Sequence, residues 1–276
     1  MNTTLRSRGY STECVSGMFD FSLSEHIKLE GLVDTHIHTA PDVRDRFMND
    51  IELASAALRE GMEAVVIKSH TEPTSGRAAL ASEVTGMRVI GGVTLNTSVG
   101  GLNPDAVHAA AMMGGRFVWL PTVSVGRAAG DLDGVISAVA EHDMVLGTGH
   151  LKPPEIFHVL DLAADYGAGK IIINHPLTGV VGATLEEQRE MSRRAYLEHC
   201  LVACMPRHDG LDFERIVESV RYVGAERCIM ATDFGQGHNP SPIAGMKQFI
   251  YLMKKHGFSH SDITMMCRDN PLELIS

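Results

Sequence analysis

The chain has 276 residues, of which 44% are hydrophobic and 21% are charged, and its formal net charge is −10. This composition is ordinary for a globular enzyme, and it argues against a nucleic-acid partner because phosphate binding requires clustered Lys and Arg. The sequence contains no run of about 18 apolar residues, so we expect no membrane span.

The N-terminal residues lack the apolar segment of a secretory signal, so we expect none. Five cysteines are scattered along the chain without a CxxC pair. Such spacing favours reduced, mostly buried thiols in a cytoplasmic protein over a disulfide framework.

Residues 1 to about 30 are weakly periodic and predict an N-terminal arm. From residue 31 onward, short apolar strands alternate with amphipathic helices. The predicted strands are Gly31–Thr35, Ala64–Lys68, Val89–Leu95, Phe117–Leu120, Val145–Thr148, Ile171–Asn174, Tyr196–Ala203 and Cys228–Ala231. The predicted helices are Asp50–Glu60, Gly76–Val84, Asn103–Met113, Leu132–His142, Pro154–Tyr166, Leu185–Arg193, Asp212–Val223 and Pro242–His256, followed by a last segment at Ser261–Arg268.

Eight strands that alternate with helices predict an α/β fold, a closed (β/α)₈ TIM barrel in one domain over residues 31–276. A doubly wound open sheet is the alternative, but no GxGxxG turn follows the first strand. Gly61, Gly167 and Gly224 stand between a helix and the next strand, as C-cap glycines do, and this supports the assignment.

The first predicted strand leads into an HxH pair, His36 and His38. Side chains at i and i+2 of a strand project to the same face, so one metal ion could take both rings. An isolated HxH pair is as often structural, and the interpretation therefore depends on whether other strands bring further ligands.

Metal-ligand residue types follow several other predicted strands, and in a (β/α)₈ barrel the strand C-termini meet at one mouth. His150 follows the fifth strand, His175 the sixth and Asp233 the eighth, while Lys68 ends the second. Imidazole and carboxylate suit Zn²⁺ or Mn²⁺. Each residue alone has a structural explanation, such as a capping role for Asp233 or a salt bridge for Lys68, but together they predict a metal centre.

Polar residues near the same strand ends are candidate substrate contacts. His70 lies two residues beyond the second strand, Asn96 follows the third, and Arg207 and His208 follow the seventh. Arg207 and His208 could contact an anionic group. Turn and cap roles are the alternative for these four residues.

These residues resemble the amidohydrolase superfamily of metal-dependent (β/α)₈ hydrolases. The resemblance rests on the HIH of the first strand, the histidines after strands five and six, the aspartate after strand eight and the terminal CRDNPLELI, and it covers residues 32–275. More narrowly, LVDTHIHTAPD, IKSHTEPT, GTGHLKPPE and ATDFGQGHNPSP resemble an uncharacterised amidohydrolase-like family of unknown function. Because only 35 residues precede His36, the resemblance implies a barrel without an N-terminal β-sandwich.

The resemblance implies a ligand set of one or two divalent ions, with Zn²⁺ preferred and Mn²⁺ the alternative. His36, His38 and Asp233 would bind the first ion, and His150 and His175 a second. The carboxylated lysine that often bridges the pair comes from strand four, which here ends in Trp119, Leu120 and Pro121. Lys68, carboxylated by CO₂, is the candidate substitute; without it, His150 would join the first set and His175 would polarise water or substrate.

The implied activity is hydrolysis of a small amide, lactone, ester or phosphoester, with Asp233 and His175 as catalytic residues. Two alternatives stay open: metal-dependent decarboxylation of an aromatic or unsaturated acid, and a catalytically silent metal-binding or ligand-binding barrel. The expected partner is a small-molecule substrate, with no nucleic acid and no membrane. Barrels of this kind often pair, and the sequence leaves open whether the chain forms a homo-oligomer.

Overall fold

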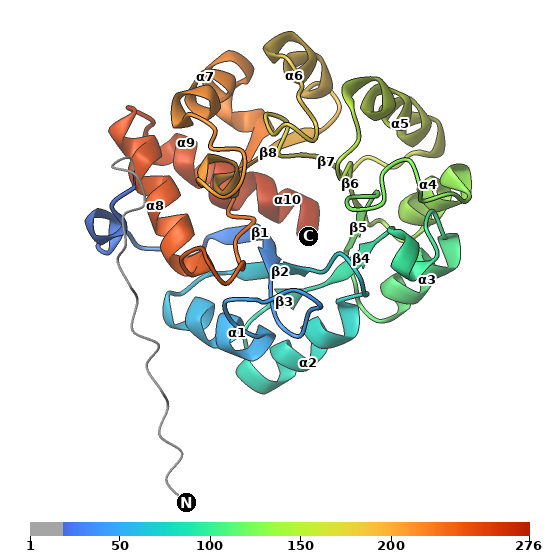
Figure 1. The fold of residues 1–276 in the computed structure, drawn as a ribbon, viewed down its shortest axis with the longest axis horizontal. Coiled ribbons are helices and arrows are strands. Elements are labelled where there is room, and N and C mark those ends of the chain that lie inside the picture. The colour runs from blue at the N-terminus through green and yellow to red at the C-terminus, as the bar shows by residue number, and fades with distance from the viewer. Residues whose placement is uncertain (1–18) are drawn as a thin grey trace, which may run out of the picture.

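A computed structural model describes residues 19–276 of the chain. In this part, short parallel strands form a ring that is surrounded by helices (Figure 1). The strands are β1 (Val33–His38), β2 (Ala64–Lys68), β3 (Val89–Ile90), β4 (Gly92–Thr94), β5 (Phe117–Trp119), β6 (Val145–Gly147), β7 (Ile171–Asn174), β8 (Tyr196–Cys200) and β9 (Cys228–Ala231).

The third predicted strand is present as two segments, β3 and β4, on either side of Gly91. β3 pairs with β2 and β4 pairs with β5, so the two segments together occupy one position in the ring. The backbone of Thr74 crosses here, because its N–H donates to the carbonyl of Gly92 at 2.8 Å. A Cβ on Gly91 would lie 2.5 Å from the carbonyl oxygen of Thr74, so this crossing requires glycine.

The ring closes between the ends of β9 and β1. The amide of Asp233 donates to the carbonyl of His36, and the amide of His38 donates to the carbonyl of Phe234, both at 2.8 Å. Beside them, the Thr232 hydroxyl donates to the Asp34 carboxylate at 2.6 Å. The fold is therefore the predicted (β/α)₈ barrel, and backbone hydrogen bonds join β1 to the residues that follow β9.

Most of the outer helices begin with side-chain caps, and they bury one face against the strands. Asn49 and Glu52 form a capping box at the first helix, and Thr184 and Glu187 form another at the sixth. The helices are α1 (Asp50–Arg59), α2 (Ser75–Thr85), α3 (Pro104–Met112), α4 (Leu132–Glu141), α5 (Pro153–Tyr166), α6 (Leu185–Met191), α7 (Phe213–Val223) and α8 (Pro242–Lys255). All eight coincide with predicted helices to within a few residues.

The C-terminal segment fills the end of the barrel at which the strands begin. α9 (His260–Thr264) leads through a π-helical turn, Met265–Asp269, into α10 (Asn270–Ile275), and the C-terminus lies inside the ring of helices (Figure 1). Leu274 and Ile275 pack among the first residues of several strands, including Val33 and Val145. Because this end is closed by apolar packing, the polar strand ends at the opposite mouth are where chemistry can occur.

The described part of the N-terminal arm is short. A 3₁₀ turn, Phe21–Ser24, is capped by Asp20 and lies against α8. Ile27 and Leu29 are buried in the core between helices and strands. Residues 1–18 of the predicted arm, Cys14 among them, lie outside the described residues.

Candidate metal centre

A bulge in β1 sets the direction of the first two histidines. Asp34 pairs with Val65 of β2, and the next pairing joins Ile37 to Ile67. β1 therefore advances three residues where β2 advances two, which is a β-bulge with one extra residue in β1. As a result, Thr35 and His36 both reach the same carboxylate across the barrel, and His38 still points into the mouth. The strand runs on to His38, three residues beyond its predicted end, because the chain after Asp233 pairs with it.

Three candidate ligand atoms converge at the mouth, two from β1 and one from the loop after β9. Oδ1 of Asp233 lies 3.4 Å from Nε2 of His36 and 3.1 Å from Nε2 of His38. Two ligands bound to one Zn²⁺ at 2.0–2.2 Å would lie about 2.8 to 3.6 Å apart in tetrahedral or octahedral geometry. The donor set and its spacing therefore fit a divalent transition-metal ion.

The other nitrogen of each ring is held by a hydrogen-bond acceptor. Nδ1 of His38 lies 2.9 Å from the carbonyl oxygen of Lys68, and a carbonyl only accepts, so this nitrogen carries the proton. Nδ1 of His36 lies 2.8 Å from Oε2 of Glu198. Both contacts leave Nε2 free to bind a metal, as outer carboxylates and carbonyls do in metalloenzymes.

Glu198 is a site residue that the sequence reasoning missed. Its buried carboxylate accepts from the Thr35 hydroxyl at 2.6 Å and from the Asn174 amide at 2.7 Å, in addition to His36. Burial by itself raises the pKa of Glu198, but His36 and these hydrogen bonds outweigh it and lower the pKa overall. The signal in the sequence was an acidic residue inside the mostly apolar predicted strand Tyr196–Ala203, because a buried carboxylate needs a partner.

The electrostatics of the cluster favour the state that binds a metal. Burial lowers the pKa of His38 and of His175 to about 4 each, so both rings are neutral at pH 7. Burial would raise the pKa of Asp233, but the neighbouring His36 and the hydrogen-bonded His38 hold it well below its usual range. Neutral imidazoles with an ionised carboxylate are the forms that coordinate metals.

His150 and His175 lie together beside the first cluster. Their ring centroids are 5.0 Å apart, and the ring of His175 is 6.1 Å from that of His36. The Thr178 hydroxyl donates to the carbonyl of His175 and lies 3.0 Å from its Nδ1, so Nδ1 is the protonated nitrogen and Nε2 is free. Burial lowers the pKa of His150 to about 2.

Two of the predicted site residues have left-handed backbone conformations. His175, directly after β7, has φ of 31°, and Asp233, two residues after the end of β9, has φ of 51°. Such conformations cost about 1 to 3 kcal/mol for a residue with a Cβ and are concentrated at functional sites. Here they turn both side chains from the strand direction into the mouth.

Lys68 points into the same cluster. Its Nζ lies 3.2 Å from Nε2 of His36 and 5.3 Å from the centre of the Trp119 ring, and the residue is 1% exposed. Burial is the main cause that lowers the pKa of Lys68. Among the described residues, no carboxylate lies within ion-pair distance of Nζ, so this buried amine is next to a candidate metal ligand without a direct counter-ion.

The predicted substrate contacts occupy two different places. His70 lies inside the cluster, with its ring 4.7 Å from that of His38. Asn96 is 1% exposed and its amide is occupied by neighbouring backbone and hydroxyl groups. Arg207 and His208 are exposed after β8, where Nε2 of His208 lies 3.1 Å from the amide nitrogen of Asn239. Substrate contact by these four residues stays a prediction.

A buried ion pair in the loop after β1 was also missed. Nε and Nη2 of Arg46 donate to Oδ2 of Asp42 at 3.0 and 2.8 Å, and both side chains are at most 2% exposed. Arg46 pairs through its backbone with Gln236, whose side chain donates to the carbonyl of Asp233. This contact joins the β1 loop to the loop that carries Asp233. In the sequence, the pair is hidden within a charged run that resembles a solvated turn.

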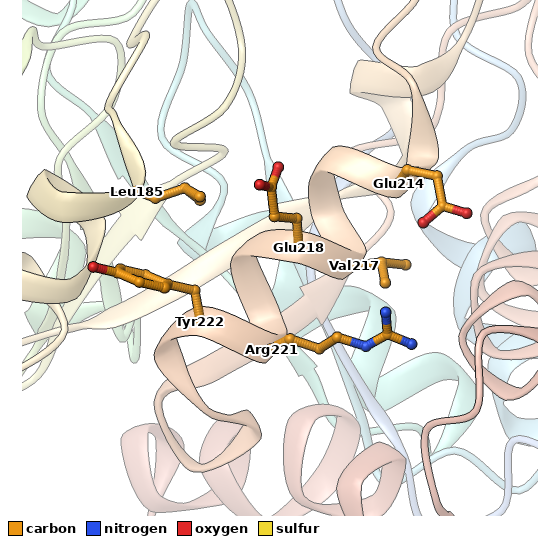
Figure 2. A pocket seen from close by; sticks show the side chains of 6 residues that line it. All are labelled: Leu185, Glu214, Val217, Glu218, Arg221 and Tyr222. Atoms are coloured by element: carbon orange, nitrogen blue, oxygen red, sulfur yellow. The ribbon is translucent and has the colours of Figure 1, made fainter.

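A surface hollow of about 380 Å³ lies away from the cluster, between α6 and α7 (Figure 2). Its lining consists of Leu185, Glu214, Val217, Glu218, Arg221 and Tyr222. Glu214 is paired with His256 and Glu218 with Arg215. The hollow contains none of the predicted site residues, which lie at or near the barrel mouth.

The four cysteines among the described residues, Cys200, Cys204, Cys228 and Cys267, are buried free thiols. In residues 19–276, every helix is too short or too polar to cross a bilayer.

Solved structures with similar folds include enzymes of several kinds. An amidohydrolase from Pseudomonas aeruginosa is 12% identical, with a TM-score of 0.63 over 89% of this chain and 95% of that one. A PTE-like lactonase mutant from Deinococcus radiodurans is 15% identical, with a TM-score of 0.58 over 91% and 98%. N-acetyl-D-glucosamine-6-phosphate deacetylase from Mycobacterium smegmatis is 18% identical, with a TM-score of 0.60 over 89% and 75%. At these identities the likeness concerns the fold.

Comparison of the sequence with curated proteins and with family models gave two results. Among proteins with curated functions, none matches the chain. The model of a family of unknown function, DUF6282, matches residues 31–131 and 124–198, which include β1 to β7 and most of the histidine cluster. The chain belongs to this family of unknown function, DUF6282, and has the (β/α)₈ fold of the amidohydrolase superfamily.

Proposed function

We propose that the chain is a metal-dependent hydrolase that cleaves a small amide, lactone, ester or phosphoester. The observation that carries the proposal is the convergence of His36 Nε2, His38 Nε2 and Asp233 Oδ1 at 3.1 to 3.4 Å in an otherwise buried mouth. Zn²⁺ is the proposed ion and Mn²⁺ the alternative, since both accept imidazole and carboxylate ligands.

Each residue has a defined task in the proposed reaction. A bound divalent ion would make water acidic enough to lose a proton near neutral pH and would polarise the scissile carbonyl or phosphoryl oxygen. Asp233 accepts that proton as water attacks, and it delivers the proton to the leaving group as the scissile bond breaks. His175 lies beside this position, and its unprotonated Nε2 can accept a hydrogen bond from the attacking water.

We further propose that Lys68 is carboxylated. An ammonium group 3.2 Å from Nε2 of His36 would repel an ion bound there. The neutral amine adds to CO₂, forming an N–C bond as one proton leaves, and the product is an anion at the same place. With His150 and His175, this carbamate would supply the ligands of a second ion.

The location of the protein is also a proposal. Four buried free thiols and the absence of a disulfide among the described residues are consistent with a reducing, cytoplasmic compartment.

Metal analysis and turnover test the hydrolase proposal together. The chain, expressed with added Zn²⁺ or Mn²⁺, is expected to retain one or two ions, and His38→Asn is expected to reduce that number, whereas the exposed His158→Asn on α5 is the matched control. Retention of less than about 0.3 ion per chain, in a site whose ligands are preformed, would overturn the proposal.

A panel of lactones, amides, esters and phosphoesters then identifies the reaction. Asp233→Asn is expected to lower kcat by about 100-fold or more, as loss of a proton-transfer group does, while the exposed Asp165→Asn leaves it unchanged. Release of CO₂ from an aromatic acid, with no activity on the panel, would instead assign a decarboxylase.

A further inference from the structure

The orientation of the Asn96 side chain is fixed by its neighbours. Its Oδ1 lies 2.9 Å from the backbone nitrogen of Thr122 and 3.1 Å from that of Ser124. Backbone N–H groups only donate, so this atom must be the amide oxygen. The Nδ2 atom then donates to the carbonyl of His70 at 2.9 Å and to the hydroxyl oxygen of Thr122 at 2.8 Å.

This orientation determines where the Thr122 proton goes. Among the described residues, the Thr122 hydroxyl has two hydrogen-bond neighbours, Nδ2 of Asn96 and Nδ1 of His70, the latter at 2.8 Å. Asn96 can only donate through Nδ2, so Nδ1 of His70 is the remaining acceptor for the hydroxyl proton. If Nδ1 carried a proton of its own, the hydroxyl of Thr122, a residue only 5% exposed, would have no acceptor.

The neutral His70 ring must therefore carry its proton on Nε2. The ring is stacked on His38 at 4.7 Å and meets the ring of His150 edge-on at 6.3 Å, so it lies between two of the proposed metal ligands. A protonated Nε2 cannot bind a metal, and Nδ1 is occupied. In the part of the chain that the structure describes, no acceptor is within hydrogen-bond range of the His70 Nε2–H.

We propose that His70 is a catalytic residue whose Nε2–H donates to the substrate oxygen that gains negative charge, and that Asn96 and Thr122 are positioning residues that fix this tautomer. The ligand class is a substrate with a carbonyl or phosphoryl oxygen at its scissile centre. A fixed, neutral donor beside the developing charge stabilises the transition state without reorganisation. The part about substrate rests on the proposed hydrolase function, whereas the tautomer does not.

Nitrogen NMR of histidine-labelled protein tests the tautomer without any substrate. With the His70 signals assigned by comparison with His70→Leu, the wild-type chain is expected to show the Nε2–H tautomer. Thr122→Val is expected to lose this preference and Thr122→Ser to keep it, since serine retains the hydroxyl. A His70 that carries its proton on Nδ1 in the wild-type chain would overturn the proposal, whether or not the chain is active.

Kinetics test the catalytic role. His70→Leu is expected to lower kcat by about 100-fold or more with metal content unchanged, which is the range for loss of one oxyanion donor. His158→Leu on the outside of α5 is the control. A wild-type rate for His70→Leu on a substrate that the wild-type chain cleaves would exclude the role of His70 and leave the hydrolase proposal standing. If the wild-type chain does not bind metal, that result counts against the hydrolase proposal, whereas the tautomer of His70 is unaffected.

Discussion

Nζ of Lys68 lies 3.2 Å from Nε2 of His36, the nitrogen that is free to bind a metal. The two residues come from neighbouring strands, β1 and β2, whose register pairs His38 with Lys68. The barrel therefore holds the amine next to the proposed metal position, and we propose that the chemical state of the amine determines how many ions the mouth can hold.

Carboxylation of Lys68 predicts a dependence on bicarbonate. Protein loaded with metal in the presence of ¹³C-bicarbonate is expected to show a carbamate carbon signal, and Lys68→Met is expected to lose that signal together with a second ion. The exposed Lys255→Met is the control. A wild-type chain that binds two ions and shows no carbamate would exclude the modification.

Glu198 is expected to strengthen metal binding through His36. Glu198→Gln keeps the shape but weakens the charge-assisted contact to Nδ1, so Zn²⁺ affinity should fall by about 10- to 100-fold, as for other outer-sphere carboxylates. Competition with a fluorescent chelator measures this, with the exposed Glu83→Gln on α2 as the control. Equal affinities of the two variants would show that Glu198 is only structural.

The unfolding free energy of the metal-free protein is expected to fall as pH drops from 6.5 towards 4. The pKa values of His38, His175 and His199 are lowered to about 4 by burial, so the unfolded chain binds protons first over this range. Each group can contribute up to about 3 kcal/mol. Asp34 opposes this, because burial raises its pKa to about 7 and the folded state then binds its proton first.

Urea denaturation at several pH values measures this dependence. His199 lies away from the mouth, with Nε2 3.2 Å from the Ser219 hydroxyl, so it offers a separate test. His199→Asn removes one titrating group. The unfolding free energy of this variant is therefore expected to fall less steeply with pH, by an amount equivalent to the uptake of up to one proton on unfolding. A stability that is constant from pH 6.5 to 4 would contradict the assignment of these rings as buried and neutral.

The Arg46–Asp42 pair is expected to stabilise the loops above the metal centre. Arg46→Met removes the ion-pair partner of the partly buried Asp42 carboxylate, which keeps only its hydrogen bond from the Arg44 backbone N–H, and should cost about 1 to 3 kcal/mol of unfolding free energy. The double variant Asp42→Asn with Arg46→Met should recover part of that loss because no charge is left unpaired. Equal unfolding free energies for the wild-type chain and Arg46→Met would show that the pair contributes little.

The fold was largely predictable because its signals are local. Alternation of apolar strands with capped helices can be recognised within windows of about ten to fifteen residues. Three elements differed from the prediction for reasons outside such windows. The first strand runs on to His38 because residues after β9 pair with it. The third strand divides at Gly91, where Thr74 crosses it, and Tyr196–Ala203 ends as a strand at Cys200, because the chain then turns into the 3₁₀ segment Leu201–Cys204.

The sequence by itself determined that His36, His38, Lys68, His150, His175 and Asp233 come together, because parallel strands deliver their C-terminal residues to one mouth. Only the tertiary structure showed which ring nitrogens of His36, His38 and His175 are held by hydrogen bonds. It also revealed Glu198, which contacts Thr35 from 163 residues away. The structure also shows that the side chain of Asn96 is hydrogen-bonded to Thr122 and to the carbonyl of His70. These features depend on hydrogen-bond partners across the barrel and on the bulge in β1, and neither leaves a periodic signal in the chain.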